Sequence, residues 1–205
     1  MSDNTSVMTT RGNRLLQTAR ATGLALWASL LCPLSARAAN WQDNAQKLYS
    51  HLQRLHWVAA GHGHKVVYDF VDPNSAVAHA LIDRLDPLIA PDGLTVRTIL
   101  VGYLTPSSAG KAAAILQSPD PLAALDRGEA GFLPGQGSTI APVAASAASA
   151  RILRADFRTL TVLEGNPWMR MAPLLVYRDQ QGRVHVFQGR LDTARLAAII
   201  RATGP

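Results

Sequence analysis

The sequence contains a single cysteine, Cys32, among 205 residues, and this scarcity excludes two classes of protein at once. A disulfide-stapled scaffold needs several cysteines, and so does a cysteine-ligated zinc site. Aromatic residues make up 6% of the chain and charged residues 17%, and no repeat with a solenoid period is visible. Since 48% of the residues are hydrophobic, we expect a globular domain with a substantial core.

The excess of positive charge is concentrated at the N-terminus. The formal net charge is +6, but the first 38 residues hold Arg11, Arg14, Arg20 and Arg37 against Asp3 alone. Without that segment, 16 basic and 13 acidic residues remain, a net charge of +3. The remaining chain therefore lacks the strong basic excess of a nucleic-acid-binding domain, and we expect no nucleic-acid partner.

Residues 1–38 have the organisation of a secretory signal peptide. Three arginines precede an apolar run at residues 21–32, and the small-x-small pattern Ala36-Arg37-Ala38 follows. The run is shorter than the roughly 20 residues that span a bilayer, and Pro33 ends it. We therefore predict cleavage near Ala38, export to the periplasm, and contact with the membrane only through the signal peptide before cleavage. The mature chain would then contain no cysteine.

The mature chain alternates helical and strand patterns in an order typical of an α/β fold. Helical spacing is seen over residues 42–57, 75–89, 105–116, 122–125, 144–163 and around 196–200, and strand patterns cover 65–71, 94–101, 174–177 and 184–187. Residues 128–142 contain four glycines and two prolines and predict a flexible loop. One N-terminal helix with a loop (39–64) comes first. A βαβ unit, a helical insertion at about 105–165 and a ββα unit follow, and these three parts form a domain over 65–205.

Three segments carry a resemblance to a known family. These segments are residues 67–73 (VYDFVDP), 100–116 and 171–177 (MAPLLVY). They resemble the periplasmic thiol:disulfide interchange proteins of the DsbC/DsbG type, most closely DsbG. The first segment is similar to the first strand of that family, the second to its second strand with the start of the helical insertion, and the third to its proline loop. The resemblance covers roughly residues 65–202 and implies a thioredoxin-like fold. It also implies that the Ala172–Pro173 bond is cis, a geometry that is uncommon in general.

Two departures from the family change the expected chemistry. Where the family has two cysteines in a CxxC motif, this chain reads Ser75-Ala76-Val77-Ala78. Disulfide exchange proceeds by attack of a thiolate on sulfur, so we expect no redox activity and no catalytic residue at these positions. The family's N-terminal dimerisation domain is also absent from the resemblance, because only about 25 residues separate the predicted cleavage site from the first strand.

Polypeptide binding needs no sulfur, and the resemblance places a peptide groove at Pro73, Asn74, Ser75, Ala172 and Pro173. Strand addition beside the proline would let an extended peptide bind there. We therefore expect a redox-inactive, chaperone-like or assembly factor for unfolded or extended polypeptide, without a cofactor. The alternative is a docking or scaffold component of an envelope complex, for instance a secretion or conjugation apparatus.

Other polar residues suggest an enzyme less strongly. Ser75, His79 and Asp72 have the residue types of a hydrolase triad, but a helix-capping serine and a solvated histidine are the simpler interpretation. Asp69 stands where thioredoxins keep a buried carboxylate. A metal site would need histidines from separate segments to converge, and we expect no such site. The candidate ligands are His51, His56, His62, His64 and His79.

The N-terminal helix determines the expected assembly. Leu48, Leu52 and Leu55 have helical spacing, but a segment this short cannot close a core of its own. Packing against the thioredoxin-like domain of the same chain satisfies this stripe without a second copy, so we predict a monomer.

The export prediction has a direct test. N-terminal sequencing of the protein from the envelope fraction should give Ala39 or Asn40 as the first residue, because the Ala36-Arg37-Ala38 pattern places cleavage after Ala38. A membrane-bound species that retains Met1 would contradict cleavage.

Overall fold

A five-stranded sheet with the order β1-β3-β2-β4-β5 forms the centre of the fold. The computed structural model describes residues 43–162 and 173–205. Strands β2 (Lys65–Val71) and β3 (Leu94–Leu100) are parallel. Strand β1 (Val58–Ala60) pairs antiparallel with β3, β4 (Leu174–Arg178) pairs antiparallel with β2, and β5 (Val184–Gln188) pairs antiparallel with β4. The sheet is therefore mixed, with the parallel pair at its centre.

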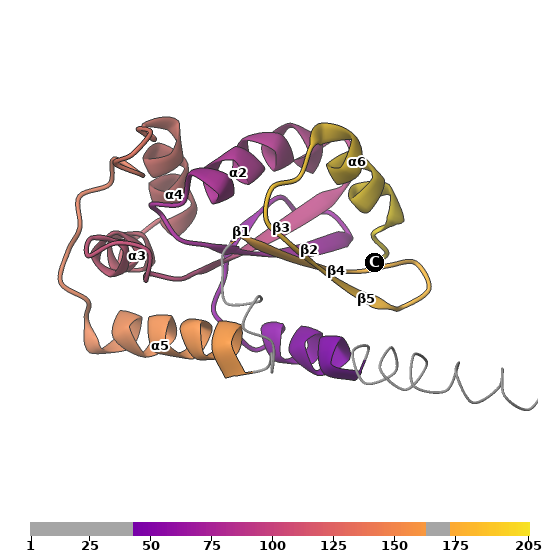
Figure 1. The fold of residues 1–205 in the computed structure, drawn as a ribbon, viewed down its shortest axis with the longest axis horizontal. Coiled ribbons are helices and arrows are strands. Elements are labelled where there is room, and N and C mark those ends of the chain that lie inside the picture. The colour runs from indigo at the N-terminus through magenta and orange to yellow at the C-terminus, as the bar shows by residue number, and fades with distance from the viewer. Residues whose placement is uncertain (1–42, 163–172) are drawn as a thin grey trace, which may run out of the picture. The chain divides into compact units, whose positions relative to one another are not determined.

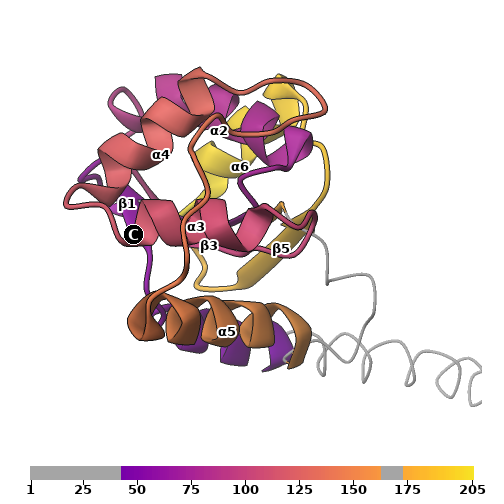
Figure 2. The ribbon, with the colours of Figure 1, turned by 90° about the vertical axis from the view of Figure 1, so that its left-hand side faces the viewer.

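Helices cover both faces of this sheet (Figures 1 and 2). On one face, α2 (Ala76–Ile89) and α6 (Thr193–Ala202) pack onto Val67 and Leu175. On the other face, residues 43–52 and α5 (Ala147–Val162) pack onto Tyr68 and Val176. Successive strand residues point to opposite faces of a sheet, so alternate residues contribute to two separate apolar cores.

The helical insertion adds a third core at the end of the sheet. Helices α3 (Ser108–Leu116) and α4 (Pro121–Ala130) follow β3 and precede α5. Their small and aliphatic residues contact the last residues of β2 and β3 and the first turn of α2. The buried members of this cluster are Val58, Val71, Ala78, Ile82, Leu100, Ala112, Ala113, Ile115, Ala124 and Leu125. This end of the sheet is consequently buried beneath the insertion.

The predicted α/β fold is confirmed in its element order. The strand predicted at 65–71 coincides with β2, the hairpin with β4 and β5, and Ser75 is the N-cap of α2. Strand β1 was not expected, because three residues carry no periodic signal and only pairing with β3 makes them a strand. Helix α4 is longer than predicted, so Gly128 lies inside a helix and not in the loop.

The N-terminal helix packs within its own chain, as predicted. Leu48 and Leu52 are almost completely buried against Tyr68, Phe70 and the neighbouring core. Trp57 also contacts Tyr68 edge to face, with ring centroids 6.2 Å apart. The leucine stripe therefore has an intramolecular partner, and the monomer stays a prediction. In the part of the chain that the structure describes, no helix combines the length and apolarity needed to cross a bilayer.

Candidate functional site

The predicted site lies at one edge of the sheet, where three loops meet. Strands β2 and β3 both end here, with Val71 opposite Leu100, and β4 begins here, with Leu174 opposite Phe70. This register brings the loop after β2, the loop after β3 and Pro173 together. The loop after β2 leads directly into α2, so its residues occupy the N-terminal end of a helix.

Ser75 and Ala78 are structural residues in this geometry. Ser75 caps α2 in an extended conformation, and its Oγ accepts a hydrogen bond from the Ala78 N–H over 3.1 Å. The serine is 6% exposed and Ala78 is completely buried, whereas Ala76 is exposed and Val77 is half-buried. The cap interaction accounts for the serine by itself, since short hydroxyl side chains are favoured at this helix position.

The other predicted groove residues are equally enclosed. Pro73 and Pro173 are buried, and Asn74 is half-buried. Ala172 lies outside the described residues, so the cis bond and the strand-addition surface remain predictions. The carbonyl oxygen of Pro173 accepts a hydrogen bond from the Gly189 N–H over 3.2 Å, which ties the start of β4 to the end of the hairpin.

Asp72 joins the three parts of this edge. Its carboxylate is 1% exposed and accepts hydrogen bonds from the Asn74 N–H, the Ser108 hydroxyl and the N–H groups of Tyr103 and Leu104 at 2.7–3.0 Å. A buried carboxylate is tolerated only when its oxygens are satisfied, and four donors achieve this. The residue therefore fixes the loops after β2 and β3 against α3.

Asn74 and Lys111 form a second, partly buried network beside it. The amide nitrogen of Asn74 contacts the hydroxyl oxygens of Thr105, Ser107 and Ser108 at 2.6–3.0 Å. Its Oδ1 accepts a hydrogen bond of 2.7 Å from the ammonium group of Lys111. Every polar atom of the Asn74 side chain is thus engaged inside the protein.

This network was missed from the sequence, although a signal for Lys111 was present. Ser108, Lys111, Ala112 and Ile115 follow one another at helical spacing and all point inward. A lysine on the buried face of an alanine-rich helix is unusual and indicates internal acceptors. The identity of those acceptors comes from a loop about 25 residues away, which no local pattern connects to the lysine.

The candidate hydrolase residues are not brought together. The Nδ1 atom of His79 lies 2.8 Å from a carboxylate oxygen of Glu129 on α4, and its Nε2 lies 3.4 Å from Asp83. Its ring also stacks on Phe132, with centroids 4.2 Å apart. Because both ring nitrogens face acidic groups, neither acts on the Ser75 hydroxyl. The histidine, on α2, instead holds α4 in place through its contact with Glu129.

No metal centre emerges from the histidines. Among the described residues, no three histidine, cysteine or acidic side chains are grouped so that they could hold a metal ion. His62 and His64 lie in the loop before β2, His51 lies on the N-terminal helix, and His56 lies in the turn that follows it.

Asp69 is buried, as the resemblance implies, and it has no hydrogen-bond partner in the part of the chain that the structure describes. The residue lies in β2, is completely buried, and neither carboxylate oxygen has a hydrogen-bond partner among the described residues. Burial raises the pKa of Asp69 well above its ordinary value, and the negative charge of Glu129 adds to this rise. An unpaired buried carboxyl with a raised pKa keeps its proton to higher pH than the same group in the unfolded chain, and this difference lowers the stability of the fold as the pH rises.

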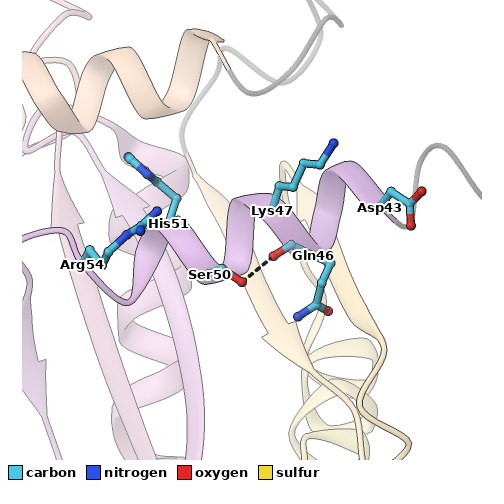
Figure 3. Close-up of a pocket in the computed structure, with 6 residues that line it drawn as sticks. All are labelled: Asp43, Gln46, Lys47, Ser50, His51 and Arg54. Carbon is cyan, nitrogen blue, oxygen red and sulfur yellow. Dashed lines mark hydrogen bonds between the residues drawn. The ribbon is translucent and has the colours of Figure 1, made fainter.

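Two surface hollows lie elsewhere on the molecule. Figure 3 shows one of about 480 Å³ along the N-terminal helix, where the marked hydrogen bond from Ser50 to the Gln46 carbonyl is internal to the helix. The other, of about 470 Å³, lies beside the β4–β5 turn, where Arg183 and His185 donate hydrogen bonds to Asp179. Burial alone would raise the pKa of Asp179, but these hydrogen bonds outweigh it and lower the pKa. Asp179 is therefore used to hold the turn.

The comparisons with known proteins agree with this geometry. The chain is 29% identical over 158 residues to the thiol:disulfide interchange protein DsbG of Pseudomonas aeruginosa and 24% identical over 157 residues to DsbG of Escherichia coli K12. Each alignment covers 76% of this chain, and it covers 59% and 61% of the two relatives. The chain is DsbG-like in sequence. It spans about three fifths of the length of these relatives, and no family model matches it.

Solved structures show the fold of this DsbG-like chain. A linker-deletion variant of Proteus mirabilis ScsC superimposes with a TM-score of 0.63 at 17% identity, over 93% of this chain and 97% of the other. The catalytic domain of the same protein gives 0.56 at 16% identity over 77% and 96%. A disulfide interchange protein from Neisseria gonorrhoeae gives 0.51 at 17% identity over 72% and 94%. The thioredoxin-like fold expected from the sequence is confirmed.

The unpaired Asp69 predicts a stability that falls as pH rises. In the unfolded chain this carboxyl ionises near pH 4, whereas the folded protein retains the proton, so unfolding is favoured progressively between pH 4 and the raised native pKa. Replacement Asp69→Asn should therefore increase the free energy of unfolding by an amount on the order of 1–3 kcal/mol at pH 8 and by little at pH 4. Urea unfolding at both pH values measures this difference.

Asp43→Asn is the matched control, because Asp43 is an exposed aspartate on the N-terminal helix. Its effect should be small at both pH values. An Asp69→Asn protein that is less stable than the parent at pH 8 would contradict the unpaired, protonated state of Asp69.

Proposed function

We propose that this chain is an exported, DsbG-like polypeptide-binding protein of the periplasm that has no thiol–disulfide activity. The observation that carries the proposal is the pair of residues at the positions that the resemblance assigns to the redox cysteines. Ser75 there is a buried helix cap and Ala78 is fully buried. The one cysteine of the sequence, Cys32, belongs to the predicted signal peptide.

The chemistry of interchange supports the absence of redox activity. The reaction needs a thiolate to attack a disulfide sulfur and a second thiol to resolve the mixed disulfide. A serine hydroxyl does neither at neutral pH, and here it is already an acceptor for the Ala78 N–H. Asp69, which would be a proton acceptor beside such a thiol, is left buried with no sulfur to serve.

The exposed apolar surface near the site supports polypeptide binding. Leu104 is 43% exposed, and its backbone N–H donates to Asp72, so the residue lies next to the loop that carries Pro73 and Asn74. An apolar side chain at this position can contact the apolar residues of an unfolded chain without any thiol chemistry. We expect the protein to act as a monomer and without a cofactor.

A docking or scaffold role in an envelope complex is the second candidate. It is favoured by the enclosure of Pro73, Ser75 and Pro173, which leaves little of the predicted groove on the surface. It is also favoured by the exposed side chains of Val143 and Phe157, which lie on the insertion at 45% and 41% exposure. A hydrolase is not supported, because His79 is bound to Glu129 and Asp83.

The redox part of the proposal predicts that the protein has no thiol–disulfide interchange activity and that two introduced cysteines form a disulfide. The mature protein should not reduce insulin or isomerise scrambled disulfides above background. The variant Ser75→Cys/Ala78→Cys should form an internal disulfide, since positions three apart at a helix start lie within the roughly 4.4–6.8 Å Cα separation of disulfides. Thiol titration with and without reductant measures the bond.

The single variant Ser75→Cys serves as the control, because it places one thiol at the same site and can form no internal bond. Interchange activity of the parent protein that persists after removal of contaminating oxidoreductases would overturn the proposed inactivity. A double variant that folds but stays reduced under air would overturn the alignment of Ser75 and Ala78 with the family's cysteines.

The binding part of the proposal predicts that Leu104 contributes to affinity. The protein should suppress aggregation of reduced insulin B chain, and Leu104→Asp should weaken binding of labelled B chain at least about fivefold, because a lost apolar contact is worth about 1 kcal/mol or more. Val143→Asp is the matched control, with the same exposure outside the loops of the site. Absence of binding by the parent protein would leave the scaffold role as the better explanation.

A further inference from the structure

Residues 131–138 form a cap over the segment that precedes Ser75. Leu133 and Gly137 bridge each other within it through two backbone hydrogen bonds of 2.8 and 3.0 Å. At its end, the Ser138 N–H donates to the Pro73 carbonyl oxygen over 2.8 Å. Gly137 lies so close to Asn74 that a Cβ atom added to it would collide with the Asn74 side chain. The cap therefore rests directly on residues 73 and 74.

Lys111 ties the cap to the body of the protein. Its ammonium group donates hydrogen bonds to Asn74 Oδ1 at 2.7 Å, to the Gln136 carbonyl at 3.0 Å and to the Ser138 carbonyl at 2.6 Å. The residue is only 8% exposed, and the acceptors of these three hydrogen bonds are neutral oxygens. A buried ammonium is stabilised only if its donors are satisfied, so the cation favours the closed cap, which supplies two of the three acceptors.

The base of the cap is fixed as well. Phe132 stacks on the ring of His79, which is bound to Glu129 on α4. Ser138 is 2% exposed, and a Cβ atom added to Gly128 of α4 would collide with its hydroxyl group. The cap is thus held at both ends, and the flexible loop expected from its glycine and proline content is replaced by a structured one.

We propose that residues 131–138 are a latched cap that closes the site beside Ser75, with Lys111 and Gly137 as the residues that hold it shut. Release of the cap exposes the residues that the resemblance assigns to the peptide groove, and polypeptide then gains access to them. The second half of this inference rests on the proposed polypeptide-binding function, whereas the first half concerns only the cap and stands without it.

Two glycines of the cap provide an unusually close comparison. Gly135 and Gly137 have the same left-handed backbone, with φ of +80° and +81°. A Cβ atom at Gly135 meets nothing within 4 Å, whereas at Gly137 it meets Asn74. Alanine therefore strains the backbone equally at both positions, but only Gly137→Ala pushes the cap away from Asn74.

The experiment measures access to position 75 through a thiol. In the full chain carrying Ser75→Cys and Cys32→Ser, the reaction rate with Ellman's reagent reports how often the cap opens. Gly137→Ala should raise this rate at least about tenfold over Gly135→Ala, which is a fall of about 1.4 kcal/mol in the free energy of opening. Lys111→Met should raise it similarly, and Lys47→Met, at an exposed lysine of the N-terminal helix, should not.

Far-UV circular dichroism and urea unfolding establish that each variant is folded, and the glycine pair decides the outcome if Lys111→Met does not fold. Equal rates for Gly137→Ala and Gly135→Ala, or a fast reaction in the parent thiol protein, would overturn the cap. A rate that rises while binding of insulin B chain stays unchanged would keep the cap and reject polypeptide binding at this site. Increases in both the rate and the binding would support the whole inference.

Discussion

The carboxylate of Asp72 holds together the segments that meet at the end of the sheet. It binds the loop after β2 through Asn74, the loop after β3 through Tyr103 and Leu104, and the start of α3 through Ser108. Each of these donors would lose its buried partner if the carboxylate were removed, and buried groups without partners are costly. The positions of Asn74, of the Ser75 helix cap and of the cap at residues 131–138 all depend on this one side chain.

The polar side chains at this edge hold the structure together. A thiol at a helix start is useful because the helix end stabilises its thiolate and because substrates reach it. Here the corresponding hydroxyl caps the helix, and the neighbouring asparagine is bonded to three hydroxyl groups and a lysine. All of these hydrogen bonds stabilise one closed arrangement. The site is therefore a structural, hydrogen-bonded cluster that extends to the protein surface. Leu104 lies beside it as an exposed apolar residue.

Two buried carboxyl groups remain without compensation. Asp69 in β2 and Asp156 in α5 have no hydrogen-bond partner within the described residues, and burial raises the pKa of Asp156 to about 8. Both residues thus keep their protons to higher pH than an exposed aspartate, and both reduce stability as the pH rises from about 4 to their raised pKa values. Asp69 points to the same face of β2 as Val67, which packs under α2, whereas Asp156 belongs to α5 on the other face of the sheet. Their destabilising effects should consequently be independent of each other.

Much of the fold followed from local patterns, because apolar spacing and helix-capping chemistry act within short segments. The strand at 65–71, the cap at Ser75, the hairpin and the inward stripe of Leu48 and Leu52 all belong to this class. Strand β1 did not follow, because its three residues become a strand only by pairing with β3. The length of α4 was also underestimated, since glycine at 128 suggested a loop and its tolerance in the helix depends on close packing against Ser138.

The sequence by itself determined that positions 75 and 78 carry no thiol, whatever the fold around them. It also determined the order of the elements, and it predicts an export signal. The tertiary structure alone decided that the site is closed. Lys111 and the carbonyl oxygens of Gln136 and Ser138 are about 25 residues apart, and Asn74 is more than 30 residues from Lys111. A buried cation selects its acceptors by their position in space, and no spacing along the chain encodes that choice.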